Sequence, residues 1–102
     1  FAAMKEGVYF VNVSRGGTVD TKALLDAVES GHLGGAGLDV TDPEPLPADH
    51  PLRTYDNVAL TPHLAGISDN LRQRNFDLIS TNIRRFTGGL RLINIVDKTL
   101  GY

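Results

Sequence analysis

The sequence GAGLDVTDPEPLPADHPLRTYDNVALTPHLAG, from Gly35 to Gly66, decides how the rest of the chain is interpreted. It contains two short apolar runs, Gly37–Val40 and Val58–Thr61, joined by a connection that carries four prolines. Each proline removes a backbone N–H donor and disfavours helical geometry in the residue before it, so no helix is expected there. A long irregular connection inside a compact domain is usually a binding or catalytic loop.

Two side chains with acid–base chemistry follow these apolar runs. Glu44 comes just after the first run and His63 just after the second. If both runs are parallel strands, their carboxyl ends share one edge of the sheet, where the two side chains can meet. An imidazole transfers protons near neutral pH, and a carboxylate on its far nitrogen fixes the tautomer and favours imidazolium. The alternatives are a structural histidine and a solvated loop glutamate.

The first half of the chain has a strand–helix–strand pattern. Val8–Val13 is nearly continuous in apolar residues, as expected for a strand buried on both faces. Asp20 to Ser30 is typical of an N-capped helix that Gly31 ends. The next strand is expected at Ala36–Val40, which makes the pair parallel, and a third at Val58–Thr61. The pattern predicts an α/β fold with a parallel sheet.

The two ends of the chain are expected to be as follows. Phe1–Glu6 resembles the last turn of a helix, ended by Gly7 in left-handed geometry, which indicates the carboxyl part of a longer protein. Ser68 is expected to cap a long helix over about residues 69–87, because apolar residues recur there at helical spacing. Leu90–Tyr102 is expected to form an edge strand or an arm that reaches another domain.

Further polar residues are expected at the same sheet edge. Ser14 and Arg15 follow the first strand, and Arg15 has the fork geometry that binds a carboxylate bidentately or polarises a carbonyl. A surface or phosphate contact is the other interpretation of Arg15. Asp39 ends a buried strand, where an unpaired carboxylate is costly, so it caps local backbone or faces a ligand.

Composition and spacing argue against several classes of protein. The net charge of −2 provides no basic surface for nucleic acid, and no apolar run reaches membrane-spanning length. There are no cysteines, and the three histidines have no metal-ligand spacing, so no metal site is expected. No strand–GxGxxG–helix pattern occurs, so this chain by itself lacks the pyrophosphate half of a dinucleotide site.

Three ordered motifs carry a family resemblance: MKEGVYFVNVSRGGTVDTKAL, GHLGGAGLDVTDPEPLPADHPL and NVALTPHLAGIS. From Met4 to about Ser68 the chain resembles the D-isomer-specific 2-hydroxyacid dehydrogenases, in particular glyoxylate/hydroxypyruvate reductases. The resemblance implies the later half of a Rossmann-type doubly wound parallel sheet, within a larger two-domain protein. Residues 1–89 would be the carboxyl-terminal portion of the dinucleotide-binding domain, and residues 90–102 a tail returning toward the substrate domain.

The resemblance also implies an enzyme that uses NAD or NADP to interconvert a small 2-oxo acid and its D-2-hydroxy acid. Arg15 would bind and polarise the substrate, and His63 would be the acid–base group oriented by Glu44. A cytoplasmic homodimer is implied. Because the family's phosphate loop and substrate domain are not in this sequence, the isolated chain is expected to be inactive. The implied cofactor contacts are Val13, Ser14, Arg15, Asp39, His63 and Gly66.

Two other branches of the family and an inactive remnant are the alternatives. The corepressors that sense NAD and recruit partners carry a tryptophan shortly after the histidine, whereas this sequence reads HLAGIS and has no tryptophan. Formate dehydrogenases carry a glutamine where this chain has Glu44, which disfavours that branch. A truncated remnant without chemistry is the third alternative.

Overall fold

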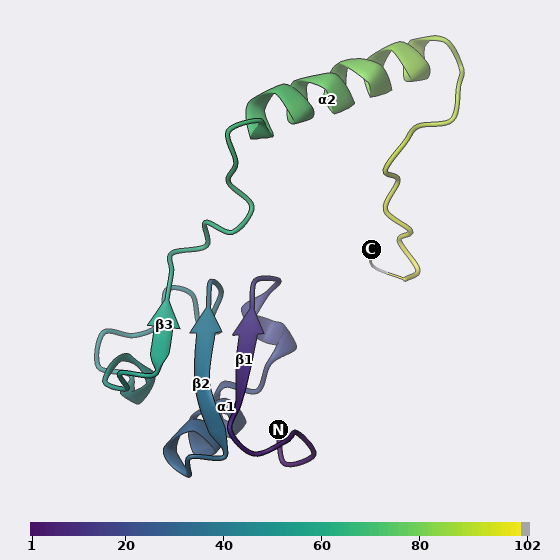
Figure 1. Cartoon of the computed structure of the whole chain (residues 1–102). Helices are drawn as coiled ribbons and strands as arrows, with labels where there is room; N and C mark the ends of the chain where they lie inside the picture. The colour runs from purple at the N-terminus through teal and green to yellow at the C-terminus, as the bar shows by residue number, and fades with distance from the viewer. Residues whose placement is uncertain (101–102) are drawn as a thin grey trace. The chain divides into compact units, whose positions relative to one another are not determined.

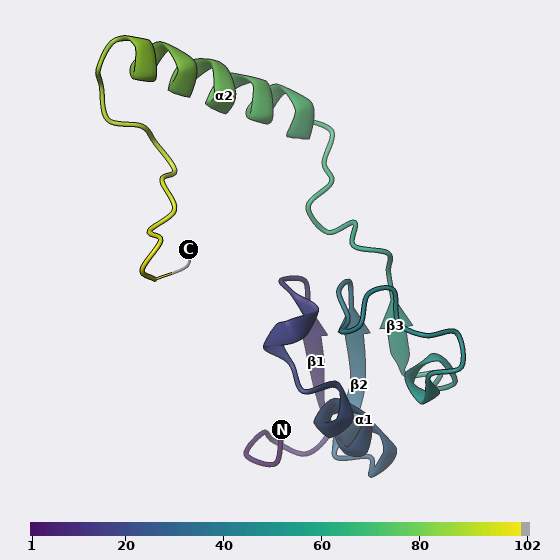
Figure 2. The ribbon, with the colours of Figure 1, turned by 180° about the vertical axis from the view of Figure 1, so that it is seen from behind.

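The computed structural model describes residues 1–100 of the chain. It divides into two compact units, Phe1–Ala65 and Gly66–Tyr102. The first unit is a small sheet with a helix against one face, and the second is a helix followed by an irregular tail (Figures 1 and 2). The domain boundary expected at residue 89 stays a prediction.

The sheet has three parallel strands in the order β1-β2-β3: β1 is Val8–Asn12, β2 is Leu33–Leu38 and β3 is Val58–Leu60. The predicted α/β fold with a parallel sheet is therefore confirmed. All three carboxyl ends lie at one edge of the sheet (Figure 1). This edge is where open α/β sheets bind ligands.

Helix α1 spans Thr21–Glu29 and connects β1 to β2. The predicted cap is present, because the Asp20 carboxylate accepts a hydrogen bond of 3.0 Å from the Ala23 N–H. Gly31 follows the helix with φ +74°, the left-handed geometry that glycine adopts most readily. The helix covers one face of the sheet (Figure 2), and its buried residues are Leu24, Ala27 and Val28.

Strand β1 differs from the prediction of burial on both faces. Tyr9 is 74% exposed and Val11 is 66% exposed in this chain, whereas Asn12 at the strand's end is buried. An apolar run shows that a strand is suited to burial, but it cannot show which neighbours are present to cover it. Phe10, which lies between these two residues, packs against the hydrophobic core.

Strand β2 begins at Leu33, three residues before the predicted start, and includes the glycine pair. A Cβ atom on Gly34 would lie 2.4 Å from the Gly7 carbonyl oxygen, and one on Gly35 would lie 2.5 Å from the Asn57 carbonyl oxygen. Only glycine allows the flanking backbones to approach so closely. Glycine is usually disfavoured within strands, which is why composition alone favours a start after the pair.

The predicted helical turn at Phe1–Glu6 is wrong. This segment forms two successive turns, closed by hydrogen bonds from Met4 N–H to the Phe1 carbonyl and from Val8 N–H to the Lys5 carbonyl. Six residues give too few helical hydrogen bonds to offset the cost of starting a helix. Gly7 does take the predicted left-handed conformation, with φ +76°.

The proline-rich connection contains no α-helix, as predicted, but it is not entirely irregular. Pro51–Arg53 forms a single 3₁₀ turn, η2. His50 caps this turn, because its Nδ1 accepts a hydrogen bond of 3.2 Å from the Leu52 N–H. Leu46 and Leu52 are buried in the hydrophobic core, and they anchor the connection there.

Helix α2 spans Leu71–Thr87 in the second unit. It begins two residues later than predicted; Asn70 is its N-cap, and the Ser68 carbonyl accepts a hydrogen bond from the Leu71 N–H in the preceding turn. The tail forms no strand over residues 90–100. Asn82 instead holds the tail through two hydrogen bonds with the Ile93 backbone. The last two residues of the predicted tail, 101–102, lie outside the described residues.

Replacing Gly16 with alanine is expected to lower the free energy of unfolding by about 1–3 kcal/mol, the usual cost of overpacking. A Cβ atom on Gly16 would lie 1.9 Å from the Thr41 carbonyl oxygen, so the two backbones must separate. The matched control is Gly17→Ala, whose Cβ would meet nothing closer than the Asp42 carboxylate at 3.7 Å. Urea unfolding of the full-length protein measures both variants, and equal midpoints would contradict this interpretation.

Candidate active site

His63 lies three residues beyond the end of β3, in a tight turn. It has φ +56°, which places it in the left-handed region that residues with side chains seldom adopt. Its backbone N–H donates to the Asp39 carbonyl at 2.9 Å and to the Thr61 carbonyl at 3.1 Å. Non-glycine residues keep this conformation only where surrounding contacts hold it, and such residues often occur at functional sites.

The Asp39 carboxylate provides those contacts from the end of β2. It accepts hydrogen bonds from the Thr61 hydroxyl, the Leu64 N–H at 2.8 Å and the Ala65 N–H at 2.8 Å. The side chain is buried, with 5% of its surface exposed. The structure therefore shows that Asp39 caps local backbone, and its contact with a ligand stays a prediction. The hydrogen bonds from Thr61 and then Ala65 hold the pKa of Asp39 below its ordinary value.

The lowered pKa of Asp39 makes the stability of the folded protein depend on pH in the acidic range. Because the unfolded state binds a proton more readily than folded Asp39, the carboxylate's contribution is present above pH 3.8 and is lost as pH falls through the lowered pKa. We expect Asp39→Asn to lower Tm at neutral pH and to flatten the further fall in Tm toward about pH 3. Thermal melts of the full-length protein over this pH range check the prediction. Plots of Tm against pH that run parallel for the variant and the wild type would contradict it.

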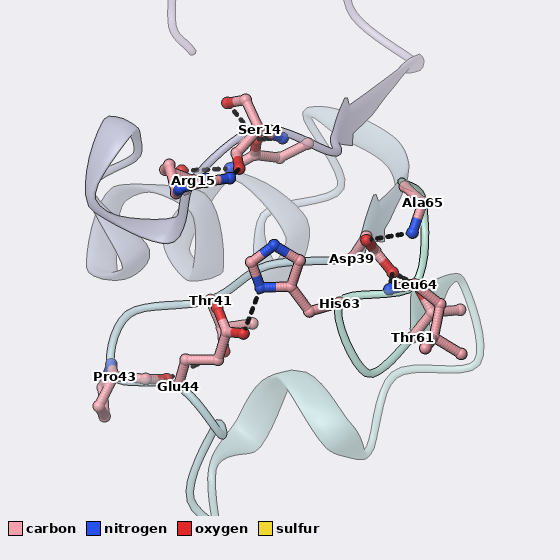
Figure 3. Close-up of polar contacts among 11 residues, drawn as sticks. Ser14, Arg15, Asp39, Thr41, Pro43, Glu44, Thr61, His63, Leu64 and Ala65 are labelled. Carbon is pink, nitrogen blue, oxygen red and sulfur yellow. Dashed lines mark hydrogen bonds and ion pairs between the residues drawn. The ribbon is translucent and has the colours of Figure 1, made fainter. Parts of the chain in front are cut away.

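Glu44 and His63 make the contact that the parallel strands predict. The Glu44 Oε1 lies 2.7 Å from the His63 Nδ1, a typical distance for a charge-assisted hydrogen bond. In Figure 3 the other ring nitrogen lies on the side of the ring away from Glu44. Both side chains are more than two-fifths exposed in this chain, at 44% for His63 and 41% for Glu44. A pair so open to water contributes little to stability, so its main consequence is to orient the imidazole.

The segment that carries Glu44 is held by hydrogen bonds on its amino-terminal side. The Thr21 hydroxyl donates to the Asp42 carbonyl at 2.9 Å, and the Thr41 hydroxyl donates to the Pro43 carbonyl at 2.9 Å. Proline on both sides of Glu44 limits the backbone further, because each ring fixes φ. The carboxylate is therefore presented from a restrained segment.

Arg15 follows β1 in a turn that the side chain of Asn12 holds. Asn12 is not among the candidate site residues predicted from the sequence. Asn12 is 6% exposed; its Nδ2 donates to the Arg15 carbonyl at 3.0 Å, and its Oδ1 accepts from the Ser14 N–H at 3.0 Å. The available signal was one polar side chain inside the apolar run VYFVNV. The Arg15 guanidinium donates to the Ser14 carbonyl at 2.7 Å and is exposed.

The structure thus brings two of the three predicted catalytic side chains into contact. Neither of the two ion pairs found in residues 1–100 includes Arg15. Figure 3 shows Ser14 and Arg15 on the opposite side of the His63 ring from Glu44. The imidazole therefore lies between the carboxylate that orients it and the segment that carries the guanidinium.

Two hollows meet at this edge of the sheet. A cleft of about 410 Å³ contains Glu44 and His63 in its lining. A second, apolar groove of about 360 Å³ lies where Val11, Gly37 and Ala59 form one row across the three strands. Gly37 leaves the middle of this row open, since a Cβ there would only touch Val11 at 3.7 Å. The remaining walls of the groove include Val13, Leu64 and Ala65.

Gly66, the last of the predicted cofactor contacts, is the first residue of the second unit. Among residues 1–100, no group of three or more histidine, aspartate or glutamate side chains is arranged to hold a metal ion. Neither helix in that part of the chain combines the length and apolar character that crossing a membrane requires.

A parallel α/β sheet with an apolar groove at the carboxyl ends of its strands is the arrangement in which doubly wound folds bind dinucleotides. The family model for the NAD-binding domain of D-isomer specific 2-hydroxyacid dehydrogenases matches residues 1–65. The chain belongs to this family.

Curated relatives include glyoxylate reductases and glyoxylate/hydroxypyruvate reductases. The glyoxylate reductase of Thermofilum pendens is 46% identical over 80 residues, which cover 78% of this chain and 24% of that protein. Glyoxylate/hydroxypyruvate reductase A of Photorhabdus laumondii is 39% identical over all 102 residues, which cover 32% of its length. The chain therefore spans about a third or less of these relatives.

Solved structures give the same result. A D-isomer specific 2-hydroxyacid dehydrogenase from Xanthobacter autotrophicus, in complex with NADPH and MES, is 44% identical with a TM-score of 0.92, over 99% of this chain and 41% of that one. The NADPH-dependent glyoxylate/hydroxypyruvate reductase of Sinorhizobium meliloti, in complex with NADP and sulfate, is 40% identical with a TM-score of 0.82, over 92% and 29%.

The chloroplastic/mitochondrial formate dehydrogenase of Arabidopsis thaliana is 48% identical over 71 residues, which cover 70% of this chain and 18% of that protein. Overall identity therefore does not separate the reductases from the formate dehydrogenases. The separation by Glu44 stays a prediction.

Proposed function

We propose that the whole protein of which this chain forms part reduces a small 2-oxo acid, such as glyoxylate or hydroxypyruvate, to its D-2-hydroxy acid with NADH or NADPH. The observation that carries the proposal is the 2.7 Å contact between Glu44 and His63 at the carboxyl edge of a parallel sheet. The family match and the named activities of the relatives support it.

The apolar groove suits the nicotinamide end of the cofactor. The row of Val11, Gly37 and Ala59 offers a flat, apolar floor, and a larger side chain at Gly37 would fill its middle. Val13 and Leu64 would flank the ring. The carboxylate of Asp39 already accepts three hydrogen bonds, so its proposed contact with the nicotinamide amide would be an additional one. When bound, the cofactor supplies the hydride.

The chain's own residues would move the proton and hold the substrate. His63, protonated and paired with Glu44, would give its proton to the carbonyl oxygen as the alcohol forms. Arg15 would bind the substrate carboxylate and support the negative charge that develops on that oxygen. In residues 1–100 the guanidinium donates a hydrogen bond to the Ser14 carbonyl and takes part in no ion pair. It can therefore turn toward the substrate without breaking an ion pair.

Replacing Glu44 with glutamine in the full-length protein is expected to slow reduction by about 10–100-fold, the range seen when the hydrogen-bond partner of a metal-ligating histidine is replaced. The amide cannot balance the charge of an imidazolium, so the pH–rate profile for reduction should differ from that of the wild type. Initial rates across a pH series measure both effects. Asp49→Asn, which removes another carboxylate of the same loop, is the control. A Glu44→Gln profile that superimposes on wild type would reject the pairing.

The activity is tested by NAD(P)H oxidation with glyoxylate and hydroxypyruvate, followed by determination of the product's chirality. Turnover that yields the D-isomer is expected from the full-length protein. NAD(P)H binding without turnover of either acid would contradict the proposal and favour the corepressor-like alternative, which a partner pull-down then examines. Turnover of formate instead would assign the protein to the formate dehydrogenase branch.

The preferred nucleotide, the homodimer and the cytoplasmic location are further parts of this proposal. KM values for NADH and NADPH decide the first, and sedimentation of the full-length protein decides the second. The isolated 102-residue chain lacks the glycine-rich phosphate loop. We expect it to show no turnover under conditions in which the full-length protein is active.

A further inference from the structure

Arg53 has a guanidinium that binds two successive backbone carbonyls of its own loop. Its Nη2 donates to the Leu46 carbonyl at 2.6 Å, and its Nε donates to the Pro47 carbonyl at 2.9 Å. Neither ion pair in residues 1–100 includes Arg53, so its hydrogen bonds there act on backbone geometry. The rigid fork of an arginine suits this task, because it places two donors in a fixed relation.

These carbonyls lie two and three residues beyond Glu44. Pro45 lies between them and Glu44, and its ring fixes the backbone angle φ. Only a few backbone torsions between Glu44 and these carbonyls are therefore free to rotate. Leu46 itself is buried in the core, as is Leu52 next to Arg53. The backbone that carries the guanidinium and the backbone that accepts its hydrogen bonds are therefore both anchored in the core. Fixing the Leu46 carbonyl therefore restricts the position of the Glu44 Cα atom, from which the side chain extends.

The opposite flank of Glu44 is already restrained by the hydrogen bond from the Thr41 hydroxyl to the Pro43 carbonyl. Arg53 supplies the matching restraint on the carboxyl-terminal side. It also lines the same cleft as Glu44 and His63, which places the fork next to the pair whose geometry it would control. Because that pair is open to water, packing alone does not hold the carboxylate in place.

We propose that Arg53 is a positioning residue for the proton transfer: its two hydrogen bonds hold Glu44 where the carboxylate meets the His63 Nδ1. The proposal rests on the proposed function of the Glu44–His63 pair. It predicts that Arg53→Gln lowers kcat about tenfold, as loss of an outer orienting contact does, with KM for the 2-oxo acid nearly unchanged. The pH–rate profile should move in the same direction as that of Glu44→Gln.

A double-mutant cycle in the full-length protein tests it. If Arg53 acts through Glu44, then Arg53→Gln combined with Glu44→Gln should be no slower than Glu44→Gln alone. Thr54→Val is the matched control, because it removes the hydrogen bond of 2.8 Å from the Thr54 hydroxyl, just after η2, to the Pro51 carbonyl and leaves the hydrogen bonds on both sides of Glu44 in place. This control should leave the pH–rate profile unchanged. Arg53→Lys, which can reach one carbonyl, should restore part of the rate.

A second readout does not depend on turnover. In ¹⁵N-histidine-labelled protein, Arg53→Gln should shift the His63 ring-nitrogen signals toward those of Glu44→Gln, and Thr54→Val should not. Independent effects in the cycle with unmoved ring signals would overturn the role of Arg53 and leave the proposed function standing. An inert Glu44→Gln would overturn the proposed function instead. If Arg53→Gln does not fold, the same cycle with Arg53→Lys gives the decision.

Discussion

His63→Ala in the full-length protein is expected to lower kcat for reduction of the 2-oxo acid by about 10²–10⁴-fold, the usual contribution of a positioned acid–base group. Two effects combine in this loss. The reaction loses its proton donor, and the carbonyl oxygen loses the imidazolium that stabilises developing charge. The left-handed turn at His63 would remain, because Asp39 holds it through neighbouring backbone and the Thr61 hydroxyl.

This stability of the turn makes the variant informative. The loss should appear mainly in kcat, while the dissociation constant for NAD(P)H should change much less, because His63 is only one of several implied cofactor contacts. His32→Ala is the control, since the His32 Nε2 contacts the Phe1 carbonyl at 3.1 Å and lies outside the site. Stopped-flow single turnovers measure the chemical step directly. A His63→Ala protein that reduces the acid at close to the wild-type rate would reject the assignment.

Arg15→Gln is expected to lower kcat/KM for the 2-oxo acid by about 10²–10³-fold, the range seen when one donor to a developing oxyanion is removed. The substrate would lose a bidentate partner for its carboxylate, so KM for the acid should rise while KM for NAD(P)H changes little. Arg15→Lys should recover only part of the activity, because an ammonium group cannot reproduce the planar fork.

Lys22→Gln provides the comparison for the loss of one positive charge. Lys22 lies on α1 and pairs with Asp26 at 2.6 Å, with 80% of its side chain exposed, so its removal should not change kcat/KM. If Arg15→Gln and Lys22→Gln change kcat/KM by the same factor, Arg15 contributes only to the overall electrostatic field of the protein. A loss of NAD(P)H affinity confined to Arg15→Gln would assign the guanidinium to the cofactor instead of the substrate.

Much of the fold could be predicted because its signals are local. The Asp20 cap and the glycine that follows α1 depend on a few neighbouring residues, and both are present. Parallel pairing followed from the strand–helix–strand order, which requires a crossover connection. Helix α2 was placed within two residues, although its N-cap is Asn70 and not Ser68.

The errors arose where a segment's structure depends on its neighbours. Burial of β1 was predicted from its apolar composition, yet Tyr9 and Val11 are exposed here. The predicted strand starts after the glycine pair, and the advantage of glycine at this place lies in the backbones of Gly7 and Asn57 that pass beside it. In both cases the deciding atoms belong to other parts of the chain.

For the candidate site, the sequence by itself determined that Glu44 and His63 follow parallel strands, and hence that they could meet at one sheet edge. Only the tertiary structure decided that they touch, that Asp39 holds the His63 turn, and that Arg53 binds the backbone beyond Glu44. The physical reason is that the position of each strand along the chain is indicated by a pattern within one segment. Hydrogen-bond partners instead depend on distances of a few ångströms between segments far apart along the chain, which no local pattern specifies.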